Sequence, residues 1–299
     1  MFYQPRTIEE ALSLKRQLGP DAAFLAGGTD VIVLMNHGRL VAKATIDLTH
    51  VTGFDRLQVS GVDGQGSSVT LDGGVTFAQL ARLPVKCLAE ASLGVGGPQI
   101  RNRGTIAGNV ATASPAGDGS TALLALDAVL ELRNSDTSRK VPLRDFFLDY
   151  RKTALAPDEM ITAVEFPGKW RTAWQKLGKR GAMNISMVCC AVGVSPEGMF
   201  RVAFGSVGPY PLRAPNTEEF LSAKLEEQNG RGSALADSQT LVLLSETVIA
   251  EAERMASHEV RPIDDFRASA AYRRAMSGAL LKKCLRDLGG KPEPVKFSG

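Results

Sequence analysis

The chain has 299 residues, of which 44% are hydrophobic and 22% charged, so it holds enough apolar material for two domains or one large one. The formal net charge is only +3, and Lys and Arg form no basic block, which leaves nucleic-acid binding unsupported. No apolar run approaches the roughly 20 residues that a membrane span needs, and the opening MFYQPRTIEE is unlike a signal peptide, so we expect a cytoplasmic protein.

The first half of the chain alternates short apolar runs with helical patterns. The first expected element is a helix that begins at a capping box at residues 7–10 and ends at residues 19–20. Apolar runs at 22–26 and 31–35, a strand at 44–48 and a hairpin of 58–62 and 68–73 follow. A second helix begins at a capping box at 76–79, and a third covers 85–93. The segment that follows, GVGGPQIRNRGTIAGNVATASPAGDG, is too rich in glycine and too long for a simple turn.

In the second half, STALLALDAVLEL changes from a helical to a strand-like pattern, and DEMITAVEFP alternates as a strand does. The charged GKWRT at 168–172 is the expected domain boundary. Beyond it, we expect an antiparallel meander at 172–180, 185–194 and 200–208, helices at 217–225 and 238–255, and a last helix whose apolar face is Tyr272, Met276, Leu280, Cys284 and Leu288. Clustered strands and clustered helices favour an α+β fold.

The cysteines and histidines show none of the spacings that metal ligands need. The four cysteines lack a C-x-x-C pair and the three histidines are isolated; they are Cys87, Cys189, Cys190, Cys284, His37, His50 and His258. We therefore expect reduced thiols in a reducing compartment, and neither a zinc site nor an iron–sulfur cluster held by this chain.

The stretch FLAGGTDVIV at 24–33 places two glycines, a hydroxyl and a carboxylate between apolar runs. Glycine lets consecutive amides converge on a diphosphate, because no Cβ blocks the approach. Since each charge-assisted hydrogen bond contributes about 1.5–3 kcal/mol, a few amides are enough to hold a dinucleotide. We expect residues 26–30 to present such amides, with Thr29 adding its hydroxyl; the alternative is an ordinary strand-to-strand turn.

A second glycine-rich loop, GGPQIRNRGTIAGN, carries Arg101, Arg103, Thr105 and Asn109. Asp118 follows it, in a place that suits a ribose hydroxyl or the N-cap of the next helix, and the two roles are compatible. Neither G-x-G-x-x-G between a strand and a helix nor a P-loop pattern is present, so neither a Rossmann fold nor a P-loop is predicted.

Four blocks, LAGGTDVIVLM, GPQIRNRGTIAGNVATASPAGD, YRKTALAPDEMITAVEFP and KLGKRGAMNIS, occur in this order along nearly the whole chain. Together they closely resemble the FAD-binding (medium) subunits of molybdenum hydroxylases, the xanthine dehydrogenase group. The resemblance implies a two-lobed FAD-binding domain of the vanillyl-alcohol oxidase (PCMH) type at residues 1–168. It further implies a smaller α+β domain of the CO dehydrogenase flavoprotein type, with a three-stranded sheet, at 169–290, and a tail at 291–299.

The same resemblance implies FAD contacts, carried over motif by motif. They are Leu25, Ala26, Gly27, Gly28, Thr29, Asp30, Val31 and Ile32 in the first loop, Thr105, Ile106, Ala107, Gly108 and Asn109 in the second, and Asp118, Ile161 and Lys176 beyond them. A cation at Lys176 would stabilise the charge that reduction places near N1 of the flavin. Many relatives have a second glycine where this chain has Ala107, which we therefore expect at negative φ.

The family's activity implies non-covalent FAD on this chain, molybdopterin on a large partner subunit and two [2Fe–2S] clusters on a small one, in a heterotrimer or its dimer. Electrons would pass from the clusters through FAD to NAD or another acceptor, as in a xanthine dehydrogenase-like oxidoreductase (EC 1.17), with no catalytic residue on this chain. The G-G-T-D of the first loop resembles xanthine- and nicotinate-type relatives rather than CO dehydrogenase flavoproteins, which favours an N-heterocycle substrate.

Three alternatives stay open. The chain would be a free-standing FAD-dependent oxidase or reductase of the same fold, a CO dehydrogenase-type medium subunit, or a non-catalytic module that has kept a nucleotide-like loop. The first requires groups that polarise a substrate and donate a proton, and no persuasive set of serine, glutamate and arginine is present.

Overall fold

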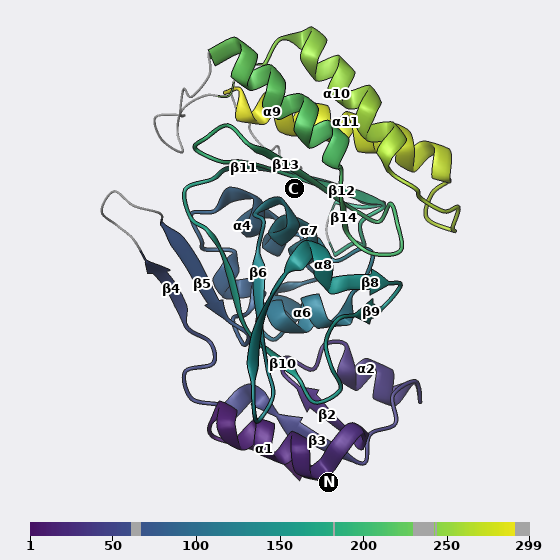
Figure 1. Ribbon diagram of the computed structural model, residues 1–299. Helices are drawn as coiled ribbons and strands as arrows, with labels where there is room; N and C mark the ends of the chain where they lie inside the picture. The colour runs from purple at the N-terminus through teal and green to yellow at the C-terminus, as the bar shows by residue number, and fades with distance from the viewer. Residues whose placement is uncertain (61–66, 182, 230–241, 243, 291–299) are drawn as a thin grey trace.

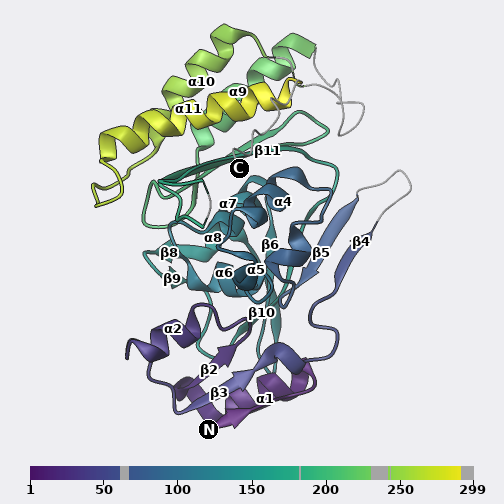
Figure 2. The same ribbon diagram turned by 180° about the vertical axis from the view of Figure 1, so that it is seen from behind.

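The computed structural model describes residues 1–299 except 61–66, 182, 230–241, 243 and 291–299. Its helices are α1 (Ile8–Leu18), α2 (Val31–Asn36), α3 (Phe77–Leu80), α4 (Lys86–Leu93), α5 (Pro98–Arg101), α6 (Ile106–Thr112), α7 (Asp118–Ala125), α8 (Leu143–Phe146), α9 (Pro215–Asn229), α10 (Glu246–Glu259) and α11 (Ala270–Leu288). Its strands are β1 (Phe2–Tyr3), β2 (Ala22–Leu25), β3 (Ala44–Asp47), β4 (Leu57–Ser60), β5 (Ser68–Asp72), β6 (Val129–Arg133), β7 (Ser138–Pro142), β8 (Phe147–Asp149), β9 (Lys152–Thr153), β10 (Met160–Pro167), β11 (Arg171–Leu177), β12 (Val188–Val194), β13 (Phe200–Gly205) and β14 (Leu212–Arg213). They form a small N-terminal lobe, a central lobe and a layer of long helices at the opposite end (Figures 1 and 2).

The N-terminal lobe is a parallel sheet in the order β1-β3-β2, covered by α1. Thr7 caps α1 and accepts a hydrogen bond from the Glu10 amide. The Glu10 carboxylate accepts from the amide of Arg6 rather than that of Thr7, so half of the predicted capping box forms. The buried side chains of Leu12 and Ile46 form the core of this lobe.

The central lobe is built on an antiparallel sheet in the order β4-β5-β10-β6-β7. The predicted hairpin is confirmed as β4 and β5, and the turn between them lies outside the described residues. The second predicted capping box is complete, because Thr76 and Gln79 bond each other's backbone amides. Every residue of α7 is buried, so this helix forms the centre of the main core.

The C-terminal sheet, in the order β11-β12-β13-β14, is the predicted meander with one more strand. The resemblance implied three strands, and the two-residue β14 adds a fourth at the edge of the sheet beside β13. Helices α9 and α11 cover one face, with α10 packed against both of them, while α4 and α7 of the central lobe cover the other face (Figure 1). All seven residues of β12 are buried, because this strand has helices on both of its faces.

Two predictions about the long helices were wrong. A helix was expected from residue 238, but α10 begins at Glu246, where Ser245 accepts a hydrogen bond from the Val248 amide. Residues 242 and 244 are not helical, and 238–241 and 243 lie outside the described part of the chain. In α11, Tyr272 of the predicted apolar face is 43% exposed, whereas Arg273 is buried. Steps of four residues rotate by about 40° each around a helix, so they leave a single face within a few turns.

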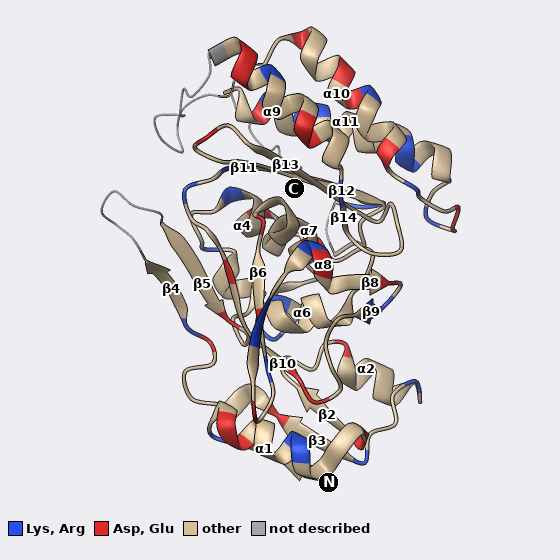
Figure 3. Cartoon of the chain, in the orientation of Figure 1, with Lys and Arg blue, Asp and Glu red and all other residues tan. Residues whose placement is uncertain are grey.

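Charged residues of both signs are interspersed along α9, α10 and α11 (Figure 3). Pairs such as Lys282–Glu253 and Arg286–Glu246 join α11 to α10 across this surface. Within the described residues, no helix has both the length and the apolar character needed to cross a membrane.

Candidate functional site

The two glycine loops meet at the junction between the N-terminal and central lobes. A Cβ on Gly27 would lie 1.9 Å from the carbonyl oxygen of Arg103, so the backbones touch in a way that only glycine permits. Gly28 has a φ of +76°, in the left-handed region that favours glycine. The first loop joins β2 to α2, so the alternative of a strand-to-strand turn is wrong.

Backbone amides are available in the first loop, whereas those at the start of α6 in the second loop are occupied. The N–H groups of residues 27–31 donate to no acceptor within the described part of the chain. In the second loop, the amide of Ile106 donates to the carbonyl of Val75 and that of Ala107 to the carbonyl of Gly73. Since unpaired amides before a helix attract anions, the first loop has the donors that a diphosphate needs.

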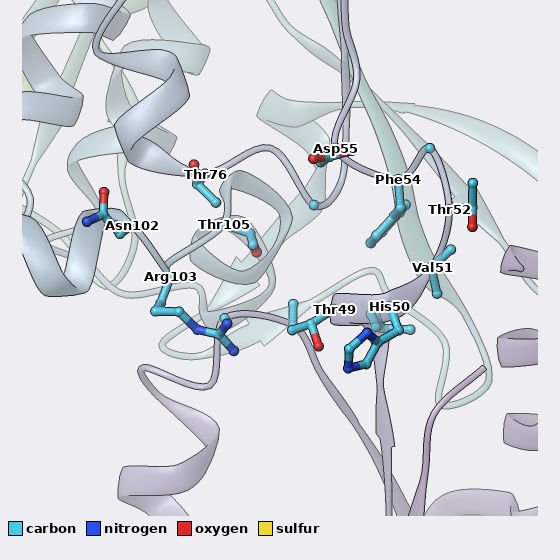
Figure 4. Close-up of a pocket in the computed structure, with 15 residues that line it drawn as sticks. Thr49, His50, Val51, Thr52, Phe54, Asp55, Thr76, Asn102, Arg103 and Thr105 are labelled. Carbon is cyan, nitrogen blue, oxygen red and sulfur yellow. The ribbon is translucent and has the colours of Figure 1, made fainter. Parts of the chain in front are cut away.

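A cavity of about 440 Å³ opens beside the contact between the loops. It is lined by Ala26, Gly27, Leu48, Thr49, His50, Val51, Thr52, Gly53, Phe54, Asp55, Gly74, Thr76, Asn102, Arg103 and Thr105. In Figure 4 the Arg103 side chain extends from the second loop towards Thr49, and the Thr105 hydroxyl lies between them and Asp55. The cavity thus offers a cation, hydroxyl groups and backbone atoms from both loops.

The stretch 48–55, which forms one wall of this cavity, was not predicted from the sequence to belong to the site. His50 was expected to be isolated, and in the structure it lines the cavity next to Thr49. The available signal was a polar run, LTHVTGFD, directly after the strand β3, at the end of a parallel sheet where ligands often bind.

Helix α6 places the second set of predicted residues. Thr105 caps it by accepting a hydrogen bond from the Gly108 amide. The Asn109 side-chain oxygen accepts from the amide and the hydroxyl of Ser120, both at 3.1 Å, and so joins α6 to α7. Ala107 lies inside α6 and does not have positive φ, as expected. Ile106 is fully buried, in the main apolar core.

Asp118 and Lys176 form a buried ion pair across the junction between α7 and β11. The Lys176 Nζ lies 2.6 Å from Oδ2 of Asp118, and the Ser186 hydroxyl donates to Oδ1 at 2.6 Å. Burial raises the pKa of Asp118, and the Lys176 charge and the Ser186 hydrogen bond oppose that rise. Gly117, not Asp118, is the N-cap of α7, so the N-cap prediction for Asp118 was wrong.

The remaining predicted residues lie at the margins of the site. Asp30 occupies the N-cap position of α2, is exposed and makes no capping hydrogen bond. Ile32 is 42% exposed in the first turn of the same helix. Ile161 is buried in β10. The carbonyl of the next residue, Thr162, accepts a hydrogen bond from the Gly73 amide, and the Gly73 carbonyl accepts one from Ala107 of the second loop. The other first-loop residues, Leu25 and Val31, are half-buried at the end of β2 and the start of α2.

Within the described residues, no hydrogen bond or ion pair joins Lys176 to the first loop, so the predicted residues form two groups. One group surrounds the contact between the glycine loops, and the other surrounds the pair of Asp118 and Lys176. The bonds of Asn109 to α7 connect them, because Asp118 begins the same helix that Asn109 contacts.

Two known protein families match this chain. The family described as the FAD binding domain in molybdopterin dehydrogenase matches residues 1–169. The family described as the CO dehydrogenase flavoprotein C-terminal domain matches residues 233–288. The expected α+β fold, a FAD-binding domain followed by a C-terminal domain of the CO dehydrogenase flavoprotein type, is thereby confirmed.

Individual relatives cover most of the chain. A putative xanthine dehydrogenase FAD-binding subunit of Escherichia coli is 29% identical over 97% of both chains. The nicotinate dehydrogenase FAD-subunit of Eubacterium barkeri is 34% identical, covering 74% of this chain and 78% of its own. Among solved structures, a carbon monoxide dehydrogenase from Hydrogenophaga pseudoflava that lacks the Mo-pyranopterin moiety superposes with a TM-score of 0.80, at 28% identity over 95% of both chains.

Proposed function

Since this chain belongs to the family of FAD-binding domains in molybdopterin dehydrogenases, we propose that it is the electron-transfer subunit of a molybdenum-containing hydroxylase. In this proposal, electrons from [2Fe–2S] clusters on a partner subunit pass through FAD to NAD or another acceptor. Bound FAD supplies the redox chemistry, and the chain supplies position, electrostatics and exclusion of water. No side chain of this subunit is required as a general acid or base.

The observation that carries the proposal is the meeting of the glycine loops beside a cavity. The amides of residues 27–31 have no partner among the described residues, and the contact of Gly27 with Arg103 closes the two loops against each other. These amides would hold the diphosphate, since several amide donors converging on an anion need no cationic partner. The Arg103 guanidinium extends into the adjoining cavity and adds positive charge there (Figure 4).

We assign the FAD contacts to the two groups of predicted residues. The residues around the diphosphate end would be Leu25, Ala26, Gly27, Gly28, Thr29, Asp30, Val31, Ile32, Thr105, Ile106, Ala107, Gly108, Asn109 and Ile161. The isoalloxazine ring would lie at the other end, towards Asp118 and Lys176. No histidine or cysteine lies in either glycine loop, so the cofactor would be bound without a covalent tether.

The partners follow from the same proposal. A molybdopterin-binding large subunit and a [2Fe–2S] small subunit would complete a cytoplasmic heterotrimer or its dimer. The division of this chain into residues 1–168, 169–290 and 291–299 is likewise proposed. It is supported by the short connection between β10 and β11 and by a separate apolar core beneath α9 to α11.

For the substrate of the complex we propose an N-heterocycle, as for a xanthine dehydrogenase-like enzyme. The sequence of the first loop, which contains Gly28, Thr29 and Asp30, resembles that of xanthine- and nicotinate-type relatives. A CO dehydrogenase-type medium subunit is the second candidate, because the medium chain of that enzyme from Hydrogenophaga pseudoflava is 29% identical to this chain. Assay of the purified native complex with hypoxanthine, nicotinate and carbon monoxide distinguishes the two.

The cofactor proposal is tested by the visible spectrum of the purified chain with added FAD. We expect the wild-type protein to retain flavin and Gly28→Val to lose it, because valine is disfavoured at a φ of +76° and crowds Ile32 and Leu25. Gly38→Val is the matched control. Gly38 also has positive φ, with no atom within 4 Å of its Cβ position, so this variant carries the same backbone strain outside the loops.

A wild-type chain that stays colourless with excess FAD would contradict the proposal and favour a non-catalytic module. A wild-type chain that binds FAD and oxidises a substrate without any partner would favour a free-standing oxidase. Equal flavin retention by Gly28→Val and Gly38→Val would remove the first loop from the binding site.

A further inference from the structure

Lys176, Asp118 and Ser186 form a buried polar cluster between the central lobe and the C-terminal sheet. The side chains of Lys176 and Asp118 are 13% and 5% exposed, and Ser186 is 1% exposed. Asp118 begins α7, Lys176 lies in β11, and Ser186 precedes β12. The cluster therefore depends on three segments that are distant in the sequence.

The ammonium group of Lys176 has used all three of its N–H donors. It donates to Oδ2 of Asp118 at 2.6 Å, to the Gly94 carbonyl at 2.9 Å and to the Asn184 carbonyl at 3.1 Å. With no N–H left to offer, Lys176 acts on a neighbouring ligand through its charge. That charge is offset whenever Asp118 is ionised, so the protonation state of Asp118 decides the net charge of the pair.

Three groups face the Asp118 carboxylate. Lys176 approaches one oxygen, the Ser186 hydroxyl donates to the other, and the buried Cys189 thiol of β12 lies nearby. A hydroxyl that donates to a carboxylate stabilises its ionised form. Ser186 is itself held in place, because its carbonyl accepts a hydrogen bond of 2.8 Å from the Ser206 hydroxyl.

We propose that Ser186 is a positioning residue that keeps Asp118 ionised against Lys176 and so sets the charge presented to the flavin. This inference rests on the proposed function, since it requires FAD to lie beside the pair. Removal of the hydroxyl favours the protonated carboxyl and leaves the Lys176 charge unbalanced. An unbalanced cation favours reduced FAD, which carries more negative charge than oxidised FAD.

The test compares the dissociation constants of oxidised and reduced FAD on the full chain, measured anaerobically for wild type, Ser186→Ala and Ser186→Thr. We expect Ser186→Ala to raise the preference for reduced FAD by up to about tenfold at pH values between the Asp118 pKa of wild type and that of the variant, since loss of one charge-assisted hydrogen bond shifts a carboxylate equilibrium by about tenfold. Ser186→Thr keeps the hydroxyl and should restore the wild-type ratio.

The pH dependence separates this positioning role from simple destabilisation. As pH falls, the preference for reduced FAD should begin to rise at a higher pH in Ser186→Ala than in wild type, because the Asp118 pKa is higher there. Ser195→Ala is the matched control: Ser195 is 1% exposed directly after β12, and its hydroxyl accepts from the Met199 amide away from the cluster. It should leave the ratio and its pH profile unchanged.

A Ser186→Ala protein that still binds FAD and keeps the wild-type ratio at every pH of the titration overturns the proposal. If Ser186→Ala does not fold, Asp118→Asn tests the same idea, because a neutral side chain beside Lys176 must raise the preference for reduced FAD, and an unchanged ratio again overturns it. Failure of the wild-type chain to bind either form of FAD refutes the proposed function instead, so the two failures are distinguishable.

Discussion

A single methyl group at Gly27 tests whether the contact between the glycine loops forms the binding site. In Gly27→Ala the new Cβ would lie 1.9 Å from the Arg103 carbonyl oxygen, and Cβ atoms essentially never approach other atoms closer than 3.0 Å. The difference between these distances means that the loops must separate by about 1 Å, and a shift of that size breaks hydrogen bonds whose donor–acceptor distance is close to 2.9 Å. Overpacking of this kind also destabilises the fold by about 1–3 kcal/mol.

We expect Gly27→Ala to raise the FAD dissociation constant by about a hundredfold. The estimate assumes the loss of one or two amide hydrogen bonds to phosphate, each worth about 1.5–3 kcal/mol. Isothermal titration or fluorescence quenching measures the binding, and urea denaturation of the FAD-free chain measures the stability. Gly181→Ala is the control, because no atom lies within 4 Å of its Cβ position.

A Gly27→Ala protein that binds FAD as tightly as Gly181→Ala would refute this reasoning. It would mean that the loops adjust without moving their amides, or that the diphosphate binds elsewhere. A loss of stability without a loss of FAD affinity would lead to the same conclusion, since the loop contact would then be structural only.

Two further predictions concern α6 and the outer edge of the central lobe. Asn109→Ala should weaken FAD binding by about 1–3 kcal/mol and lower the melting temperature of the FAD-free chain, because Asn109 accepts two hydrogen bonds from Ser120; an unchanged dissociation constant would limit Asn109 to a structural role. Glu159→Gln should lose stability at neutral pH, because the two hydrogen bonds from Arg139 hold the pKa of Glu159 below its ordinary value of 4.5. The ionised form stabilises the fold above the unfolded pKa, so the difference from wild type should shrink as pH falls through the lower folded pKa. Urea denaturation at neutral and acidic pH measures this difference in the free energy of unfolding. A difference that does not change with pH would contradict the stabilising role of ionised Glu159.

The sequence was sufficient to predict features that depend on local pattern. The Thr76 capping box, the β4–β5 hairpin and the negative φ of Ala107 all follow from short-range chemistry, and the structure confirms them. The specific motif block around residues 98–109 was enough to identify the family. Each of these features is decided by residues that are close together in the chain.

Features that depend on distant partners were missed. The ion pair of Asp118 was not predicted, because nothing near Asp118 in the sequence reveals Lys176, 58 residues further on. The burial of Arg273 in α11 is likewise decided elsewhere, by Asp265 and by the Ser206 carbonyl. Tertiary contacts of this kind override a helical pattern, since pairing stabilises a buried arginine at a position that the pattern leaves off the apolar face.

The C-terminal sheet shares an apolar core with the central lobe, so the two are not independent folding units. Trp174, Cys189 and Ala191 belong to the same apolar core as α7, although they follow the proposed boundary at residue 168. A chain cut there would expose the inner face of β11 and β12 to water and leave α7 without its cover. Recombinant fragments that end near this boundary should therefore aggregate and be poorly soluble. Chimaeras between relatives should exchange the sheet together with the central lobe against which it packs.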